Sequence, residues 1–155
     1  EYVEMEELLE NSDVLTLHIP GSEKTKHLLS TEEFEKMKKG AVLINTSRGD
    51  IVDVDAMLHA LADERLAAAG LDVLPEEPTI REEAELLRSF FRKEHNLDTL
   101  LADHVLLRMM NVYITPHSAF NTREAVQRIL DTTVENIRAF AEGKPRNVVT
   151  PKKKD

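Results

Sequence analysis

The chain has 155 residues, a formal net charge of −9 and no cysteine. This length suits one domain with a real hydrophobic core and is too short for two domains of ordinary size. The absence of cysteine excludes disulfide bonds, thiolate metal sites and a cysteine nucleophile, and no metal site is predicted. The acidic balance argues against a nucleic-acid partner, because phosphate binding requires a basic surface. No long apolar run is present, so we expect no membrane-spanning helix. The absence of cysteine makes a small secreted protein improbable, and we therefore expect a cytoplasmic protein.

Short apolar runs alternate along the chain with stretches of helical periodicity, which indicates βα units that build a parallel sheet. The predicted strands are Val14–His18, Ala41–Asn45, Ala67–Asp72 and Val112–Thr115, and Tyr2–Glu4 is a candidate short edge strand. Each of the four main runs is apolar on both faces, as expected of a strand that helices cover on two sides. The fold class is therefore α/β, with about four parallel strands flanked by helices.

Helix signals lie between these strands. Ser30 and Glu33 form a possible capping box, Gly40 is placed as a C′ glycine, and Asp53 is expected to cap a helix that continues through Leu61. Apolar residues at helical spacing predict a last helix from about Thr122 to Ala141, followed by a stop at residues 143–145. Residues 79–110 are interpreted as two helices that pack over the sheet or against a partner.

Polar residues follow each predicted strand, and ligands of open α/β sheets collect at that edge. Taken alone, each residue has an ordinary structural explanation: Arg48 as a surface cation, Glu77 as a loop carboxylate and His117 as a histidine at a strand end. Together they suit 2-oxo-acid chemistry. An arginine matches a carboxylate in two bonds, a histidine exchanges a proton near neutral pH, and a carboxylate beside the imidazole favours its charged form.

Four ordered strings then resemble the C-terminal half of the NAD-dependent D-2-hydroxyacid dehydrogenase family: LHIP, INTSRGDIVD, AGLDVLPEEP and ITPHSAFNTREAV. The segment PHSAFNTREAV within the last string is most similar to the D-lactate dehydrogenase branch. The resemblance covers most of residues 1–150 and implies half of a doubly wound, Rossmann-like fold. It implies a partial NAD-binding domain over residues 1–143, followed by a basic tail over residues 144–155.

The resemblance also implies roles for residues at the strand ends. Arg48 matches the arginine that binds the substrate carboxylate, Glu77 the carboxylate that partners the catalytic histidine, and His117 that histidine. Glu76 is the rival for the carboxylate role, and the residues alone do not separate it from Glu77. The positions that match loops at the nicotinamide end of NAD are His18, Ile19, Pro20, Thr46, Ser47 and Asp72. The implied reaction is hydride transfer between NAD(H) and a small 2-hydroxy or 2-oxo acid, with D-lactate and pyruvate favoured.

Two departures from the family pattern are visible. The five glycines form no G-x-G-x-x-G fingerprint, which in the family grips the pyrophosphate at a helix N-terminus. The spacer from Glu77 to His117 is long and charged beside many family members. The chain also begins at Glu1 without an initiator methionine. We therefore expect a fragment of a dehydrogenase that is inactive alone, with little or no NAD binding.

An alternative of a different class is a half-fold folding or interaction module without catalysis. Residues 14–18 would then form an apolar sheet edge, and such edges pair with other chains. This predicts a homodimer through the exposed sheet edge or the terminal helix. A phosphoacceptor signalling domain is set aside, because such domains need clustered acidic residues after the first strand, where this chain has His18, Ile19 and Pro20.

Overall fold

The computed structural model of the chain describes residues 2–75 and 105–149. The chain divides into two units, Glu1–His117 and Ser118–Asp155, which are described separately. The elements, in chain order, are α1 (Met5–Asn11), β1 (Val14–Leu17), α2 (Thr31–Lys36), β2 (Ala41–Asn45), the 3-10 turn η1 (Gly49–Ile51), α3 (Val54–Ala62), β3 (Leu66–Leu71), β4 (Val112–Ile114) and α7 (Arg123–Ala141). Most of the stretch 79–110, predicted as two helices, lies outside the described residues.

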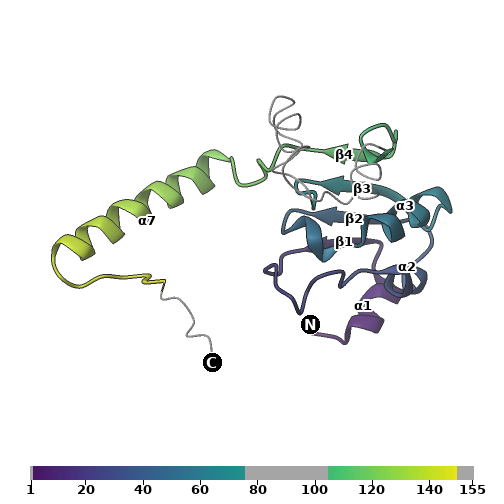
Figure 1. Ribbon diagram of the computed structural model, residues 1–155, viewed down its shortest axis with the longest axis horizontal. Coiled ribbons are helices and arrows are strands. Elements are labelled where there is room, and N and C mark those ends of the chain that lie inside the picture. Colours follow the sequence, from purple (N-terminus) through teal and green to yellow (C-terminus); the bar gives the residue numbers. More distant parts are fainter. Residues whose placement is uncertain (1, 76–104, 150–155) are drawn as a thin grey trace, which may run out of the picture. The chain divides into compact units, whose positions relative to one another are not determined.

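The first unit is built on one sheet of four parallel strands in the order β1-β2-β3-β4 (Figure 1). This confirms the predicted fold of parallel strands flanked by helices. The strand β2 has the predicted bounds. The strands β1 and β4 end one residue before their predicted ends, and β3 begins and ends one residue before its predicted bounds. Since all the strands are parallel, their carboxyl ends lie at one edge of the sheet, and the loops that carry the candidate residues begin there.

The hydrophobic core lies against one face of this sheet. It contains Leu9 of α1, Phe34 of α2, Met57 of α3 and strand residues such as Leu43 and Leu66, all of which are at most 2% exposed. Burying a side chain of this size stabilises the fold by about 1.5–3 kcal/mol.

The other face of the sheet is less covered than the sequence predicted. Burial alternates along β1, where Leu15 and Leu17 are buried while Val14 and Thr16 are exposed, and β2 alternates buried with half-buried residues. The reason lies in the topology. The strands β1, β2 and β3 follow one another across the sheet, and right-handed crossovers then place both connecting helices, α2 and α3, on the same face.

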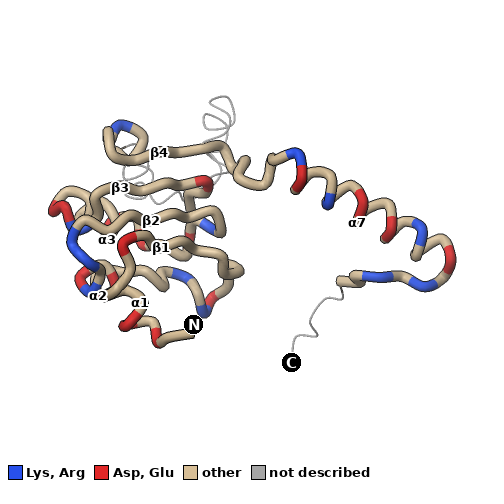
Figure 2. Tube along the Cα trace, turned by 180° about the vertical axis from the view of Figure 1, so that it is seen from behind, with Lys and Arg blue, Asp and Glu red and all other residues tan. Residues whose placement is uncertain are grey.

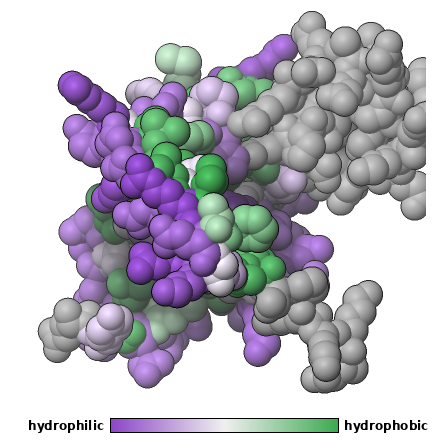
Figure 3. Space-filling view, turned by 90° about the vertical axis from the view of Figure 1, so that its left-hand side faces the viewer, coloured by the Kyte–Doolittle hydropathy of each residue, from purple (hydrophilic) through white to green (hydrophobic). Residues whose placement is uncertain are grey.

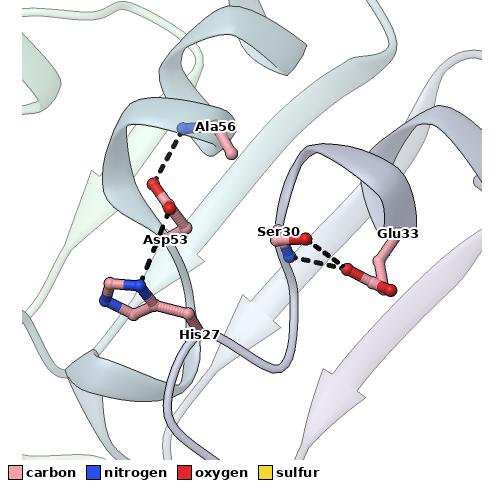
Figure 4. A network of polar contacts seen from close by, with 5 residues as sticks. All are labelled: His27, Ser30, Glu33, Asp53 and Ala56. Carbon is pink, nitrogen blue, oxygen red and sulfur yellow. Dashed lines mark hydrogen bonds and ion pairs between the residues drawn. The ribbon is translucent and has the colours of Figure 1, made fainter.

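The capping signals of α2 and α3 are confirmed, and Figure 4 shows both. The Glu33 carboxylate accepts hydrogen bonds from the Ser30 backbone N–H at 3.0 Å and from the Ser30 hydroxyl at 2.6 Å. These bonds hold the pKa of Glu33 below its ordinary value. The Asp53 carboxylate accepts from the Ala56 N–H at 3.1 Å and lies 3.7 Å from Nδ1 of His27. A carboxylate at this position is favoured by the unpaired N–H groups of the first helical turn.

Two local predictions are wrong. Tyr2–Glu4 is not a strand, because the helix α1 begins directly after it at Met5. Gly40 is not the C′ residue of α2, because that helix ends at Lys36. Gly40 instead forms the turn into β2 with a φ of 83°, a left-handed conformation that glycine adopts without steric cost.

The second unit contains the long helix α7, which is capped by Thr122 and followed by Gly143 at a φ of 72°, as predicted. The Thr122 hydroxyl accepts a hydrogen bond from the Ala125 N–H at 3.2 Å. After the helix, Asn147 Nδ2 donates to Asn136 Oδ1 at 2.9 Å. Arg, Asp and Glu residues are distributed along α7 (Figure 2).

Hydrophobic side chains also lie at the surface of both units. Figure 3 shows such residues among hydrophilic ones on the face that it draws. Examples are Tyr113 in the first unit and Ile137 and Phe140 in α7, which are all more than 60% exposed. Within the described part of the chain, no helix has the length and apolar character needed to cross a membrane.

Candidate functional site

The loop after β1 carries three predicted residues: His18, Ile19 and Pro20. His18 is exposed, and its Nε2 lies 2.9 Å from the Thr16 hydroxyl. Ile19 is half-buried, and its carbonyl accepts a hydrogen bond from the Ser47 hydroxyl in the next loop. The Pro20 carbonyl accepts from the Thr25 hydroxyl at 2.9 Å, which closes the loop on itself. The first predicted segment is therefore bonded directly to the second.

The turn after β2 carries Thr46, Ser47 and Arg48, and the side chain of Asn45 organises it. Asn45 is only 1% exposed. Its Oδ1 accepts from the Ser47 N–H at 3.0 Å, and its Nδ2 donates to the Arg48 carbonyl at 2.9 Å. The exposed Arg48 side chain donates through Nη1 to the Ser47 carbonyl at 2.7 Å.

Two glycines allow the neighbouring loops to approach this turn. A Cβ added to Gly21 would lie 2.9 Å from Cγ of Arg48, so the first loop contacts the arginine stem. A Cβ added to Gly49 would lie 2.1 Å from the carbonyl carbon of Leu74 and 2.3 Å from the nitrogen of Pro75. The loop after β3 therefore packs its backbone directly on Gly49, and a larger residue at this position has no room.

Asp72 follows β3 and is 4% exposed. Its N–H donates to the Asn45 carbonyl at 2.9 Å, and its Oδ1 accepts from the Thr115 hydroxyl at the end of β4. The Thr115 N–H donates to the Leu71 carbonyl at 3.0 Å. The buried carboxylate thus joins the end of β3 to the end of β4.

His117 lies two residues beyond this junction and is half-buried. Its N–H donates to the Thr115 carbonyl at 2.9 Å, and its φ of 51° is in the left-handed region. Such a conformation is uncommon for residues other than glycine, although histidine is among those enriched in it. A tight turn thus fixes the backbone from which the imidazole projects.

The structure places Arg48 and His117 at the same edge of the sheet, after strands that are separated by β3. Neighbouring strands lie about 5 Å apart, so the ends of β2 and β4 are about 10 Å apart. Glu77 and its rival Glu76 lie outside the described residues, so the pairing of His117 with a carboxylate stays a prediction.

Several residues that shape this edge were not predicted as site residues. They are Asn45, Thr115 and the glycines Gly21 and Gly49. Two signals were present in the sequence: Asn45 is a polar residue at the end of an otherwise apolar strand, and Gly49 directly follows the candidate arginine. The side-chain bonds of Asn45 span two and three positions, whereas the bond between Thr115 and Asp72 spans 43, and a local sequence pattern does not encode a contact of that kind.

A cavity of about 270 Å³ lies elsewhere in the first unit, between α2 and α3. Its lining includes Phe34, Ala56, His59 and Ala60, and none of the predicted site residues contributes to it. The carboxyl edge of the sheet, rather than this cavity, is the candidate functional site.

Comparison with known proteins gives matches over almost the whole chain. Residues 1–119 match the family described as "D-isomer specific 2-hydroxyacid dehydrogenase, NAD binding domain". The chain is 41% identical to the glycerate dehydrogenase of Methylorubrum extorquens over 95% of its own length and 41% of that protein. It is 40% identical to the glyoxylate reductase of Aeropyrum pernix over 96% of its own length and 38% of that protein.

Among solved structures, the D-lactate dehydrogenase of Aquifex aeolicus, complexed with NAD and lactic acid, is similar with a TM-score of 0.76 and 35% sequence identity. The matched region covers 93% of this chain and 41% of that one. The chain therefore spans about two fifths of the length of the proteins that it matches.

Proposed function

The chain belongs to the D-isomer specific 2-hydroxyacid dehydrogenase family, as its NAD binding domain, and we propose that its strand-end site serves hydride transfer between NAD(H) and a small 2-hydroxy or 2-oxo acid. The membership confirms the resemblance seen in the strand-end motifs. The resemblance implies NAD as the cofactor, and the family's description names the same cofactor.

The observation that carries the proposal is the interlocking of the loops at one edge of the sheet. The Ser47 hydroxyl binds the Ile19 carbonyl, Gly49 packs on Leu74 and Pro75, and Thr115 binds Asp72. The loop that carries Arg48 and the turn that carries His117 are thus both fixed to the end of β3. A rigid edge of this kind can hold an anion-binding group and a proton donor at a constant separation. Proton transfer to a bound carbonyl oxygen requires such a fixed geometry.

In the reaction that we propose, Arg48 binds the substrate carboxylate through two parallel hydrogen bonds. His117, in its protonated form, gives its proton to the carbonyl oxygen as the carbonyl carbon is reduced, and accepts a proton in the reverse direction. Glu77 supports the charged imidazole, with Glu76 as the alternative. These roles come from the family resemblance and the strand-end positions.

We assign the nicotinamide end of NAD to His18, Ile19, Pro20, Thr46, Ser47 and Asp72. Their fit is supported by the buried Asp72 carboxylate beside the ends of β2 and β4 and by the backbone groups of the two preceding loops. When bound, NADH supplies the hydride. The five glycines of the chain form no phosphate-binding fingerprint, so we propose that this chain alone binds NAD weakly or not at all and has no substantial turnover.

For the substrate we propose pyruvate and D-lactate, because residues 116–126 resemble the D-lactate dehydrogenase branch. The names of the similar proteins include glycerate, glyoxylate and lactate, and all of these are small 2-hydroxy or 2-oxo acids. The shared chemistry is a carboxylate next to a hydroxyl or carbonyl carbon. The cytoplasmic location and the boundary of the basic tail at residue 144 stay predictions.

The proposal is tested by titrating the 15N-labelled chain with oxamate, an unreactive analogue of pyruvate, and by following NADH absorbance after pyruvate is added. We expect oxamate to shift resonances of residues 46–49 and 115–117, and we expect no substantial loss of NADH. Arg48→Lys should weaken oxamate binding about tenfold or more, because lysine cannot form the paired hydrogen bonds. Asn111→Ala, at the opposite end of the sheet, is the matched control.

Oxamate shifts confined to other surfaces, or equal affinity in the Arg48→Lys variant, would refute the proposed site. Turnover at the rate of an ordinary dehydrogenase would refute the proposed inactivity of the chain alone, while leaving the assignment of the site intact.

We propose self-association as a second property, on two observations. Within the described residues, β1 pairs with β2 alone, and Val14 on this edge strand is 55% exposed. The helix α7 has no buried residue. Light scattering over a range of concentrations tests a dimer through either surface. A monomer at every concentration would contradict it, and Val14→Lys and Ile137→Asp would separate the sheet edge from the helix.

A further inference from the structure

Asn45 is an unusual residue for its position. It ends the strand AVLIN, whose other members are apolar, and it is 1% exposed. Within the described part of the chain, Asn45 and Asp72 are the polar residues classed as buried. A buried amide is costly unless its donors and acceptor are satisfied, so its presence here calls for a physical account.

The polar atoms of Asn45 are bonded to the segments that flank the candidate site. Oδ1 accepts from the Ser47 N–H at 3.0 Å, and Nδ2 donates to the Arg48 carbonyl at 2.9 Å. The backbone carbonyl accepts from the Asp72 N–H at 2.9 Å. A single buried residue therefore holds the backbone of the turn that carries Arg48 and, on its other side, the start of the loop after β3.

This arrangement determines where the Arg48 side chain starts. The carbonyl of Arg48 is fixed by the Asn45 amide, and the following residue, Gly49, packs on the backbone of Leu74 and Pro75. The stem of Arg48 contacts Gly21. The backbone from which the Arg48 side chain starts is thus held by Asn45 and by the loop after β3, while the guanidinium itself donates through Nη1 to the Ser47 carbonyl.

We propose that Asn45 is a positioning residue for Arg48: its side-chain amide fixes the 45–48 turn so that the guanidinium faces the carboxylate of the substrate. The identity of the ligand in this inference rests on the proposed function. The ordering of the Arg48 side chain by Asn45 does not depend on it. Asn45 itself does not contact the substrate, since its side chain is buried and bonded within the turn.

The test compares Asn45→Ala with Asn111→Ala in the 155-residue chain. Asn111 is a matched control, because its Nδ2 also donates to a backbone carbonyl, that of Ala67 at 3.2 Å, at the other end of β3. Three quantities are measured for each variant: the urea midpoint of unfolding, the 15N order parameter of the Arg48 Nε–H bond, and the dissociation constant for oxamate.

We expect Asn45→Ala to lower the order parameter of Arg48 Nε and to raise the oxamate dissociation constant about tenfold, while Asn111→Ala changes neither. Asn45→Asp, which keeps an acceptor for the Ser47 N–H but loses the donor to Arg48, should show the same loss of Arg48 order. If Asn45→Ala changes the urea midpoint but leaves Arg48 order and oxamate affinity unchanged, Asn45 has a structural role only and the proposal is wrong.

A measurement on the unmodified chain keeps the proposal testable if these variants do not fold. Scalar couplings across hydrogen bonds should connect the Ser47 nitrogen to Cγ of Asn45, and Nδ2 of Asn45 to the carbonyl carbon of Arg48. The absence of both couplings in a well-folded chain would overturn the inference. If the unmodified chain does not bind oxamate, the proposed function fails, and the order parameter of Arg48 still decides the role of Asn45.

Discussion

Replacing Gly49 by alanine tests the packing of the loops at the candidate site. A Cβ at this position would lie 2.1 Å from the Leu74 carbonyl carbon, 2.3 Å from the Pro75 nitrogen and 2.5 Å from the Leu74 oxygen. These are backbone atoms, so no side-chain rotation can relieve the overlap. The φ of Gly49 lies outside the left-handed region, so alanine would be free of backbone strain and the cost would come from the clash.

The size of the effect follows from the distance that the loops must move. Ordinary contacts to a Cβ begin at 3.4 Å, and the shortest contact here would be 2.1 Å. The two backbone segments would therefore have to move apart by about 1.3 Å. Overpacking of a well-packed interior costs about 1–3 kcal/mol. Because the contact is between two backbone segments, we expect a loss of about 3 kcal/mol in the free energy of unfolding.

Gly70 provides the matched control. It lies in β3, and a Cβ there would meet Cγ1 of Ile44 at 3.9 Å, an ordinary contact. Gly70→Ala should therefore stabilise the chain by about 0.4–1 kcal/mol, because alanine reduces the conformational entropy of the unfolded state. Urea unfolding followed by circular dichroism measures both variants. If the free energies of unfolding of the two variants agree within about 0.5 kcal/mol, the close approach of residues 49 and 74 is refuted.

Two further predictions concern the helix starts in Figure 4. The pKa of Glu33 is lowered by its hydrogen bonds from Ser30, so the ionised form stabilises the fold above the ordinary value of 4.5. That contribution to the free energy of unfolding should be lost as the pH falls through the lower pKa of the folded state. In Glu33→Gln, urea unfolding at several pH values should show a free energy of unfolding without this part of the pH dependence. Asp53→Ala should cost about 1 kcal/mol in the free energy of unfolding, while Asp53→Asn, which keeps a capping oxygen, should cost much less; equal losses would contradict the role of the Asp53–Ala56 bond.

The strands were predictable because each is a short apolar run bounded by turn or capping residues. Three of the four have ends one residue away from their predicted bounds, because hydropathy marks an apolar run but does not define its last paired residue. Thr115 shows how gradual a strand end is, because its N–H donates to the Leu71 carbonyl although β4 ends at Ile114. The helix α1 was not predicted, because it has only seven residues and only one of them, Leu9, is buried. A segment this short shows too little hydrophobic periodicity to indicate a helix.

The positions of the candidate residues were predictable for a topological reason. In a parallel sheet with βα connections, every residue that follows a strand arrives at the same edge, so Arg48 and His117 had to lie on one side once the strands were assigned. The contacts that hold their loops were not predictable, because they depend on the register of strands distant in sequence. The bond between Ser47 and Ile19 joins residues 28 positions apart.

The contacts at this edge converge on the end of β3, and this explains how the two halves of the candidate site are held in a constant relation. The N–H of Asp72 binds the carbonyl of Asn45, whose side chain fixes the Arg48 turn, while the Asp72 carboxylate accepts from Thr115, whose carbonyl receives the His117 N–H. Asp72 is thus the shared link between an arginine and a histidine that belong to different loops. A displacement of β3 would move both residues, whereas a change in either outer loop would move only one of them. The separation of the two candidate residues therefore depends on this central strand end.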